Sequence, residues 1–491
     1  MSARIVSTEE TPKVAIIGAG LGGVCMAIKL RQAGYRRIAV YEKAPAIGGT
    51  WRDNTYPGLA CDVPSHLYSY SFELNPDWTH AYSPGWEIQE YCEHCVDKYT
   101  IREHIRLNSE VLCSEYRDGR WHLHLSDGTH HTADILISAM GGLHLPQLPD
   151  IEGRNSFSGA AFHSARWDHD VDLNGKRVAV IGSAASAVQI VPAIAAQVDK
   201  LFLYQRTPNW IIPRRDRAYS KLSRWIFSNI PGAARLYRWL LYWIAELRWP
   251  SFLRDSIFNR LGRYLGLFHL RRQIPDVALR ARLTPDYVIG CKRILRSDDF
   301  YPALLRDNVE LVTRGIVRIE PDAIVTADDA RQVVDIIVYA TGFDVFDIVG
   351  GTQIIGPGGE SLSQRWRESI TAHRTIAVPG FPNFFMLQGP NSGLGHNSVI
   401  FMLESQTRYV VECIEQMRER GWQSMAPRPE AFAKYQNELE RDLGKMIWTG
   451  GCNSWYQDAR GHVFTLWPHT CTTYWHRMRH PDFDEYQQHP S

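Results

Sequence analysis

The chain has 491 residues, a length that allows two to four domains of ordinary size. Hydrophobic residues make up 44% and charged residues 22%, as in globular proteins, and a net charge of +1 gives no global attraction to nucleic acid. No run is apolar enough for a secretory signal or a membrane span. The nine cysteines lack the spacing of a disulfide framework, and only Cys92 and Cys95 form a CxxC pair. We therefore expect reduced thiols, no bound metal and a cytoplasmic protein.

A first βαβ unit is predicted near the start of the chain. A short β-branched run at 13–17 precedes the sequence GAGLGG, which opens a helical pattern. A second strand, 37–41, ends at Glu42. A strand, a glycine-rich turn, a helix and a strand with a terminal acidic residue are together typical of a dinucleotide-binding unit.

Each glycine of this turn has a physical role in such a unit. Gly18 allows the tight turn, Gly20 lets the backbone approach a pyrophosphate, and Gly23 permits close packing of the helix on the strand. The N-terminus of the helix offers free N–H groups to the phosphates. We therefore assign these glycines to cofactor binding.

The unit is repeated further along the chain. A second strand–loop–helix–strand pattern begins at 177–181, continues through the sequence GSAASA and reaches a strand at 201–205. Gly18 to Glu42 and Gly182 to Arg206 are both separated by 24 residues. Ala184 replaces the central glycine, and its methyl group would crowd a pyrophosphate slightly.

The two units differ in charge at the end of the second strand. A carboxylate accepts hydrogen bonds from a ribose 2′-OH, whereas an arginine pairs with a 2′-phosphate. Glu42 therefore favours FAD in the first unit, and Arg206 favours NADPH in the second, with Thr207 adding a hydroxyl contact. In the second loop we also assign Gly182, Ser183 and Ser186 to the cofactor.

Several further motifs resemble the class B flavoprotein monooxygenases, and among them the Baeyer–Villiger monooxygenases, over nearly the whole chain. The most specific is FxGxxxHxxxW followed by Asp, a pattern formed by Phe157, Gly159, His163, Trp167 and Asp168. Related N- and S-oxygenating flavoproteins usually carry Tyr or Phe at the position of Trp167. A lone histidine is more often structural than catalytic, and the resemblance implies that His163 belongs to the connection between domains.

Other segments match the same family. Gly49, Thr50 and Trp51 follow the first unit closely and are assigned to the flavin. Thr341 and Gly342 resemble the turn at which the chain re-enters the flavin domain.

Trp455 resembles a tryptophan that contacts the nicotinamide cofactor in relatives. A core aromatic residue is the alternative for Trp455.

The sequence contains no metal-ligand cluster or serine triad, so the cofactor must carry the difficult chemistry. The resemblance implies that Arg293 stabilises a flavin peroxide formed with O2. It also implies that Asp62 pairs with this arginine and contacts the cofactor, and that Lys292 reaches the NADP 2′-phosphate. Taken alone, each residue has another interpretation: Lys292 and Arg293 could be solvated cations on a loop, and Asp62 could be an ordinary turn residue.

The segment 221–272 has an unusual composition, with ten Lys or Arg residues against two acidic residues and many interleaved aromatic and leucine side chains. An amphipathic surface that docks on membranes is one interpretation. The other, which we favour because relatives carry a helical insertion here, is a subdomain that caps the substrate pocket.

The resemblance implies an α/β fold with two Rossmann-like dinucleotide-binding domains, for FAD and NADP, and a helical insertion in the NADP domain. We predict the first part of the FAD domain at 1–150 and its second part, with the C-terminal segment, at 336–491. The NADP domain is predicted at 151–335, with its insertion at about 214–285.

The predicted function is oxygen insertion from O2 into ketones, giving esters or lactones, with sulfoxidation as a side activity. An N- or S-oxygenating flavin monooxygenase is the first alternative, and Trp167 and Arg293 argue against it. A disulfide reductase is disfavoured because no CxxxxC follows Gly49. An inactive flavin-binding sensor is the non-enzyme alternative, and Ala184 is the only feature that favours it.

Overall fold

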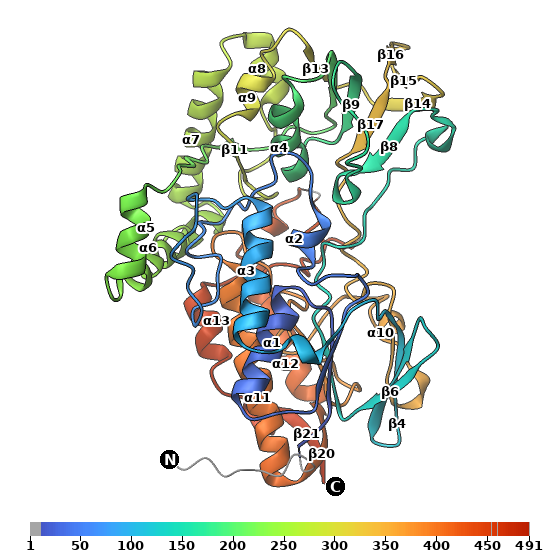
Figure 1. Ribbon diagram of the computed structural model, residues 1–491, viewed down its shortest axis with the longest axis vertical. Coiled ribbons are helices and arrows are strands. Elements are labelled where there is room, and N and C mark those ends of the chain that lie inside the picture. The colour runs from blue at the N-terminus through green and yellow to red at the C-terminus, as the bar shows by residue number, and fades with distance from the viewer. Residues whose placement is uncertain (1–10, 453, 459, 491) are drawn as a thin grey trace.

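The computed structural model describes residues 11–452, 454–458 and 460–490 (Figure 1). Residues 1–10, on which the prediction of no secretory signal partly rests, lie outside this description. Among the described residues no helix is long and apolar enough to cross a bilayer.

A first parallel sheet forms the core of one half of the molecule, in the strand order β19-β7-β1-β2-β3. Its strands are β1 (Val14–Ile17), β2 (Ile38–Tyr41), β3 (Ile105–Arg106), β7 (Ile135–Ser138) and β19 (Phe384–Met386). The central strands β1 and β7 are buried at every position, as expected for strands covered on both faces. This sheet therefore combines the first 138 residues with a strand from the last third of the chain.

Helices surround this sheet, most of them in the lower half of Figure 1. The helices are α1 (Leu21–Gln32), α2 (Thr50–Asp53), α3 (Gly85–Lys98), α11 (Val399–Arg420), α12 (Pro429–Leu443) and α13 (Cys471–Arg477). Helix α1 lies between its neighbours and buries Val24, Ile28 and Leu30 almost completely. A mixed sheet in the order β18 (Gln353–Ile355), β4 (Val111–Arg117), β5 (Arg120–Leu125) and β6 (His130–Ala133) lies beside them. β18 runs parallel to β4, and the other pairs are antiparallel.

A second parallel sheet forms the upper half, in the order β13-β10-β9-β17-β8. Its strands are β8 (Ala160–His163), β9 (Arg177–Ile181), β10 (Lys200–Tyr204), β13 (Val309–Val312) and β17 (Ile336–Tyr339). The helix after the second glycine-rich turn is α4 (Ala185–Ile194). The predicted pair of βαβ units is therefore present, and each unit lies in a separate sheet.

The apolar run at 333–339 forms two elements instead of a single strand. β16 (Arg331–Val333) pairs antiparallel with β15 (Ala323–Thr326), and β17 follows in the parallel sheet. Asp335 separates them, because its carboxylate accepts hydrogen bonds from the backbone and side chain of Arg177. The chain thus leaves the second sheet after Tyr339, a few residues beyond the predicted boundary at 335.

The predicted helical insertion is confirmed as α5 (Lys221–Asn229), α6 (Ala233–Glu246), α7 (Ile257–Gln273) and α8 (Val277–Leu283). α6 contacts the first half of the molecule through Arg238, which is buried and donates to the carbonyls of His66 and Leu67. After the insertion, β12 (Leu295–Arg296) pairs with β11 (Ile211–Ile212).

Further strands and two short helices complete the fold. They are β14 (Ile316–Glu320), β20 (Trp422–Pro427), β21 (Tyr486–Pro490), α9 (Phe300–Ala303) and α10 (Leu362–Arg365).

Candidate active site and cofactor clefts

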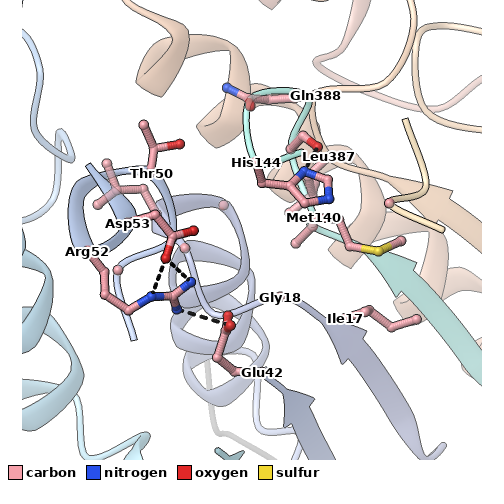
Figure 2. Close-up of a pocket in the computed structure, with 18 of the residues that line it drawn as sticks. Ile17, Gly18, Glu42, Thr50, Arg52, Asp53, Met140, His144, Leu387 and Gln388 are labelled. Atoms are coloured by element: carbon pink, nitrogen blue, oxygen red, sulfur yellow. Dashed lines mark hydrogen bonds and ion pairs between the residues drawn. The ribbon is translucent and has the colours of Figure 1, made fainter. Parts of the chain in front are cut away.

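A cleft of about 1030 Å³ opens at the end of β1, where the first glycine-rich turn begins (Figure 2). The turn and α2 form one side of the cleft, and Met140, His144 and Gln388 face them from the other side. The cleft therefore lies at the carboxyl ends of parallel strands, where α/β sheets bind their ligands.

The turn leaves no room for a side chain at Gly18 or Gly23, and it is open at Gly20. Gly18 has a φ of +102°, and a Cβ there would lie 2.7 Å from the carbonyl oxygen of Ala139. A Cβ on Gly23 would lie 1.9 Å from the carbonyl oxygen of Gly18, so only glycine allows this helix–turn packing. At Gly20 the nearest atom would be the Cα of Gly49 at 3.7 Å, so a side chain there would fill the cleft itself. This open cradle fits a bound pyrophosphate.

Glu42 lies at the foot of this cleft and is 5% exposed. Its carboxylate accepts hydrogen bonds from the backbone N–H groups of Ala19 and Ala44, at 2.9 and 3.0 Å. Arg52 contacts the same carboxylate at 3.0 Å, as Figure 2 shows. The carboxylate is therefore held beside the turn in the position that the sequence predicts for a ribose contact.

Gly49, Thr50 and Trp51 line the same cleft through the start of α2. The indole N–H of Trp51 donates to the hydroxyl of Tyr68 at 3.3 Å, which fixes the ring at the wall. The residues assigned to the flavin from the sequence are thus brought together around one cavity.

The second glycine-rich turn has the same backbone geometry. Gly182 has a φ of +108°, and a Cβ there would lie 2.3 Å from the carbonyl oxygen of Ala340. Ser183 is buried, and its hydroxyl donates to the carbonyl of Thr207 at 3.2 Å. Ser186 lies in the first turn of α4. The hydroxyl of Ser183 thus joins the turn to the segment after β10.

Arg206 and Lys292 place two cations near each other beyond this turn. The pKa of the Lys292 ammonium is lowered, first by burial and then by the positive charge of Arg206. The Lys292 Nζ lies 4.8 Å from the ring centroid of Tyr287. Because two neighbouring cations repel each other, a phosphate between them would stabilise both. These side chains therefore fit the 2′-phosphate that the sequence predicts.

Arg293 and Asp62 form an ion pair that faces a second cavity, of about 850 Å³. The guanidinium donates twice to Oδ2 of Asp62, with Nε and Nη2 at 3.1 and 2.5 Å. Asp62 raises the pKa of Arg293 above its usual range. Burial raises the pKa of Asp62, but the charge and hydrogen bonds of Arg293 outweigh this effect and lower it. Both groups are therefore charged at neutral pH.

The same cavity is lined by residues that the sequence did not single out. They are Tyr82, Arg248, Arg296, His396 and Tyr456. Tyr456 is 3% exposed, whereas the neighbouring Trp455 is 41% exposed. Burial raises the pKa of Tyr456, and the positive charge of Arg293 offsets part of this effect. These residues come from segments more than 300 positions apart, so no local spacing could have identified them.

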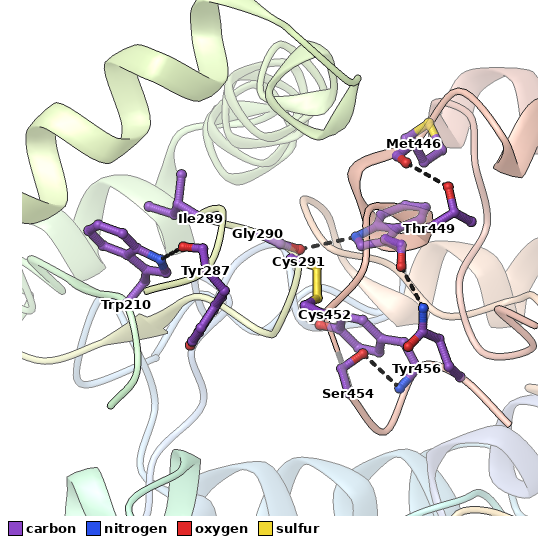
Figure 3. Close-up of a disulfide and its surroundings, with 12 residues drawn as sticks. Trp210, Tyr287, Ile289, Gly290, Cys291, Met446, Thr449, Cys452, Ser454 and Tyr456 are labelled. Carbon is purple, nitrogen blue, oxygen red and sulfur yellow. Dashed lines mark hydrogen bonds between the residues drawn. A yellow bond between two sulfur atoms is a disulfide. The ribbon is translucent and has the colours of Figure 1, made fainter. Parts of the chain in front are cut away.

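A disulfide joins the loop that carries Arg293 to a loop near the C-terminus (Figure 3). It links Cys291 to Cys452, with their Cα atoms 6.3 Å apart, and the indole of Trp448 donates to the carbonyl of Gly290 at 3.1 Å. The expectation of reduced thiols is therefore wrong for this pair. Its members are 161 residues apart, so only tertiary folding brings them together.

Cys92 and Cys95, the CxxC pair, are free thiols on the buried side of α3. Among the described residues, one group of potential metal ligands does gather, at Glu246, His396 and Cys471, with ligand atoms within 4.8 Å of one another.

Glu246 in this group already has hydrogen-bond partners for both oxygens. Oε1 accepts from the backbone N–H and hydroxyl of Thr472, and Oε2 from Asn397 and the backbone N–H of Cys471. Glu246 therefore acts here as a cap for the N-terminus of α13, and its saturated oxygens do not favour a metal.

The motif around His163 lies at the edge of the second sheet, where β8 pairs with β17. His163 is 4% exposed, and burial lowers its pKa to about 4. A Cβ on Gly159 would lie 2.2 Å from the carbonyl oxygen of Asp335, which explains the glycine there.

The rings of Phe162 and Trp167 are in contact, with their centroids 5.1 Å apart, whereas the partly buried Phe157 packs against a different apolar cluster. Asp168 is exposed and accepts from the N–H of Asp170. The residues of this motif thus have a structural role in the sheet edge, and His163 is neutral at neutral pH.

Thr341 and Gly342 follow β17 and contact the chain between the two halves. The hydroxyl of Thr341 donates to the carbonyl of Gln147 at 2.6 Å, and the N–H of Gln147 donates to the carbonyl of Gly342. These hydrogen bonds hold together the two connecting segments that run between the sheets. The structure does not place Thr341 or Gly342 on the wall of either described cavity.

Two dinucleotide-type turns, together with a separate cavity that carries an Arg–Asp pair, define a two-dinucleotide oxidoreductase. Residues 15–235 match the family described as pyridine nucleotide-disulphide oxidoreductase. The chain is 44% identical to a Baeyer-Villiger monooxygenase of Streptomyces coelicolor, with 97% of this chain and 93% of that protein covered. It is also 44% identical to one of Pseudomonas aeruginosa, with 94% and 90% covered. The chain belongs to the Baeyer–Villiger monooxygenase family.

Solved structures agree with this assignment. A structure of OTEMO in complex with FAD and NADP matches with a TM-score of 0.88 and 27% identity, over 97% of this chain and 99% of that one. A steroid monooxygenase bound to NADP matches with a TM-score of 0.87 and 29% identity, over 98% and 100%. The predicted family, fold class, enzyme class and pairing of FAD with NADP are thereby confirmed.

Proposed function

We propose that this chain inserts one oxygen atom of O2 into a ketone, with Arg293 as the catalytic cation. The balanced reaction is ketone, O2, NADPH and a proton giving ester or lactone, NADP⁺ and water. The observation that carries the proposal is the ion pair of Arg293 with Asp62 on the wall of the second cavity. When bound, FAD supplies the reaction with O2 after reduction by NADPH.

Arg293 provides a fixed positive charge in this cavity. Its pKa is raised by Asp62, so the cation does not lose its proton at working pH. A guanidinium has five N–H donors, and the bonds to Asp62 use two of them. The other donors are available to stabilise negative charge that develops on oxygen during transfer. Asp62 orients the guanidinium, and its negative charge balances the positive charge of Arg293 in the resting state.

The nucleotide sites are proposed on the residues described above. The Gly18 turn with Glu42, Thr50 and Trp51 would hold FAD. The Gly182 turn with Ser183 and Ser186 would hold the NADPH pyrophosphate. The group of Arg206, Thr207 and Lys292 would hold its 2′-phosphate, and Trp455 is proposed to contact the nicotinamide part.

A panel of cyclic, aromatic, steroid and linear ketones, with product analysis, tests the reaction. We expect an ester or lactone that contains one oxygen atom from labelled O2. Sulfoxides from thioethers without any ester would favour an N- or S-oxygenating enzyme. NADPH oxidation that no ketone or thioether stimulates would favour a flavin-binding sensor.

Arg293→Ala tests the catalytic assignment. Loss of one preorganised donor lowers turnover by roughly 10²- to 10³-fold, so ester formation should fall by this factor while flavin reduction by NADPH persists. Arg314→Ala is the matched control, because Arg314 is exposed and lies outside the lining of both cavities. Full ester yield in Arg293→Ala would show that the catalytic assignment is wrong.

A further inference from the structure

The helical insertion exposes an unusual amount of apolar surface. Of the twenty-five large hydrophobic side chains that are exposed in the described chain, fifteen lie between residues 222 and 268. Single exposed apolar residues are normal, but a concentration of this kind marks an interaction surface.

The exposed side chains of α6 form one stripe. Leu236, Trp239, Trp243 and Leu247 follow helical spacing and are 39 to 75% exposed. The opposite side of the helix buries Arg238 and other residues against the molecule. α6 thus packs through one side and presents a second, largely apolar side outward, with Arg235 exposed near its start.

α7 repeats this arrangement. Leu261, Tyr264, Leu265 and Phe268 are 51 to 60% exposed, whereas Leu270 on the opposite side is 2% exposed. Helices α5, α6 and α7 all lie along the same side of the molecule in Figure 1. We call these three helices and their exposed side chains the insertion surface.

The insertion surface is also strongly basic. Lys221, Arg235, Arg260, Arg263 and Arg271 are exposed, and no ion pair found among the described residues involves them. The two acidic residues between 221 and 272 do not balance this charge, since Glu246 is buried at the N-terminus of α13 and only Asp255 is exposed.

We propose that the insertion surface docks on an anionic lipid bilayer. Trp, Leu and Phe side chains would enter the boundary between headgroups and acyl chains, and the flanking arginines would meet the anionic headgroups. A second copy of this chain is disfavoured as the occupant, because a two-fold interface would bring two strongly basic surfaces together.

The insertion surface adjoins the second cavity, so docking would affect which substrates reach it. Ile244 and Arg248, at the C-terminal end of α6, line the cavity that holds Arg293, and both are exposed. A docked enzyme would therefore have one wall of this cavity next to the bilayer. This arrangement favours apolar ketones that partition into lipid, an inference about substrate that rests on the proposed function.

Co-sedimentation of the flavin-loaded protein with vesicles tests the docking independently of any activity. We expect binding at low salt to vesicles of phosphatidylcholine with phosphatidylglycerol, weaker binding to phosphatidylcholine alone, and release as salt is raised. Trp239→Gln with Leu247→Gln should lower the partition coefficient roughly tenfold or more. Arg260→Gln with Arg263→Gln should lower it roughly fivefold for each arginine removed.

Trp86→Gln and Arg314→Gln are the matched controls, because both residues are exposed outside the insertion, at 57% for Trp86. They should bind vesicles as the unmodified chain does, and flavin content and thermal unfolding should confirm that every variant folds. No binding at low salt, or equal binding by all variants, would overturn the proposal. So would light scattering that shows a dimer which the Trp239→Gln, Leu247→Gln variant breaks, since that face would then be an interface between copies.

Discussion

The two dinucleotide units share a turn and differ in how a helix packs behind it. Gly18 and Gly182 have nearly the same positive φ, +102° and +108°, and in both units a neighbouring carbonyl blocks any Cβ. At the third glycine position the first unit has Gly23, where a Cβ would lie 1.9 Å from a carbonyl oxygen, whereas the second unit has the fully buried Ala187. The turn is therefore common to both units, but only the second unit has room for a methyl group at the third glycine position.

The central position of the turn, Gly20 in the first unit and Ala184 in the second, has the same backbone conformation in both. Gly20 and Ala184 have similar extended backbones, with φ of −78° and −86°. Any residue can adopt this conformation, so Ala184 causes no strain and leaves only a methyl group facing a ligand. What separates the units chemically is Glu42, buried beside Ala19, against Arg206, exposed near Lys292.

The largest expected effect is that of Gly23→Ala. The added methyl would overlap the carbonyl of Gly18, and overpacking of this kind costs about 3 kcal/mol, so the first sheet should lose stability and flavin. Thermal unfolding and flavin content per chain measure this effect. The matched change Ala187→Gly should cost about 1 kcal/mol or less and leave flavin content intact. A Gly23→Ala protein with full flavin content would show that the two units do not differ as described.

Arg206→Ala comes next and tests which dinucleotide the second unit selects. Loss of a charge-assisted bond to phosphate costs about 1.5 to 3 kcal/mol, so the KM for NADPH should rise roughly tenfold or more, with little change for NADH. Steady-state oxidation of both nucleotides gives the ratio, with Arg314→Ala as the control. An unchanged preference for NADPH would mean that Arg206 does not contact the 2′-phosphate.

A smaller effect, at His163 on the edge of the second sheet, depends on pH. Burial lowers the pKa of His163 to about 4, below its ordinary value of 6.5. As the pH falls below 6.5 the unfolded chain binds a proton first, so the folded state loses stability until about pH 4. At about pH 5 the loss should be about 1 kcal/mol, after allowance for partial screening by solvent.

His163→Asn should remove this part of the acid sensitivity. Thermal unfolding at neutral and acidic pH, compared with the unmodified chain, measures the difference. Equal acid sensitivity of the two proteins would contradict a buried neutral histidine at this position.

The smallest expected effect is that of Ala184→Gly. Because the backbone is already extended, removal of the methyl should strengthen NADPH binding by less than about threefold, or about 0.6 kcal/mol. Equilibrium titration of NADP⁺ measures this change. A gain of a hundredfold would show that the methyl group blocks the pyrophosphate in the natural chain.

Local sequence was sufficient to predict the repeated unit. Turn glycines, strand periodicity and the residue at the end of the second strand act within about 25 residues, so Gly18, Glu42, Gly182 and Arg206 could be assigned from spacing alone. The ion pair of Arg293 with Asp62 required the family resemblance as well, because its members are 231 residues apart.

Tertiary structure alone decided the rest. Cys291 is bonded to Cys452, and Tyr456 lines the cavity of Arg293, because loops from separate halves of the molecule converge there. The basic composition of 221–272 was evident in the sequence, but it did not show which side of α6 is buried. Helical periodicity predicts that a face exists, whereas only packing against the rest of the molecule decides which face remains exposed. For α6 the exposed face is the apolar one.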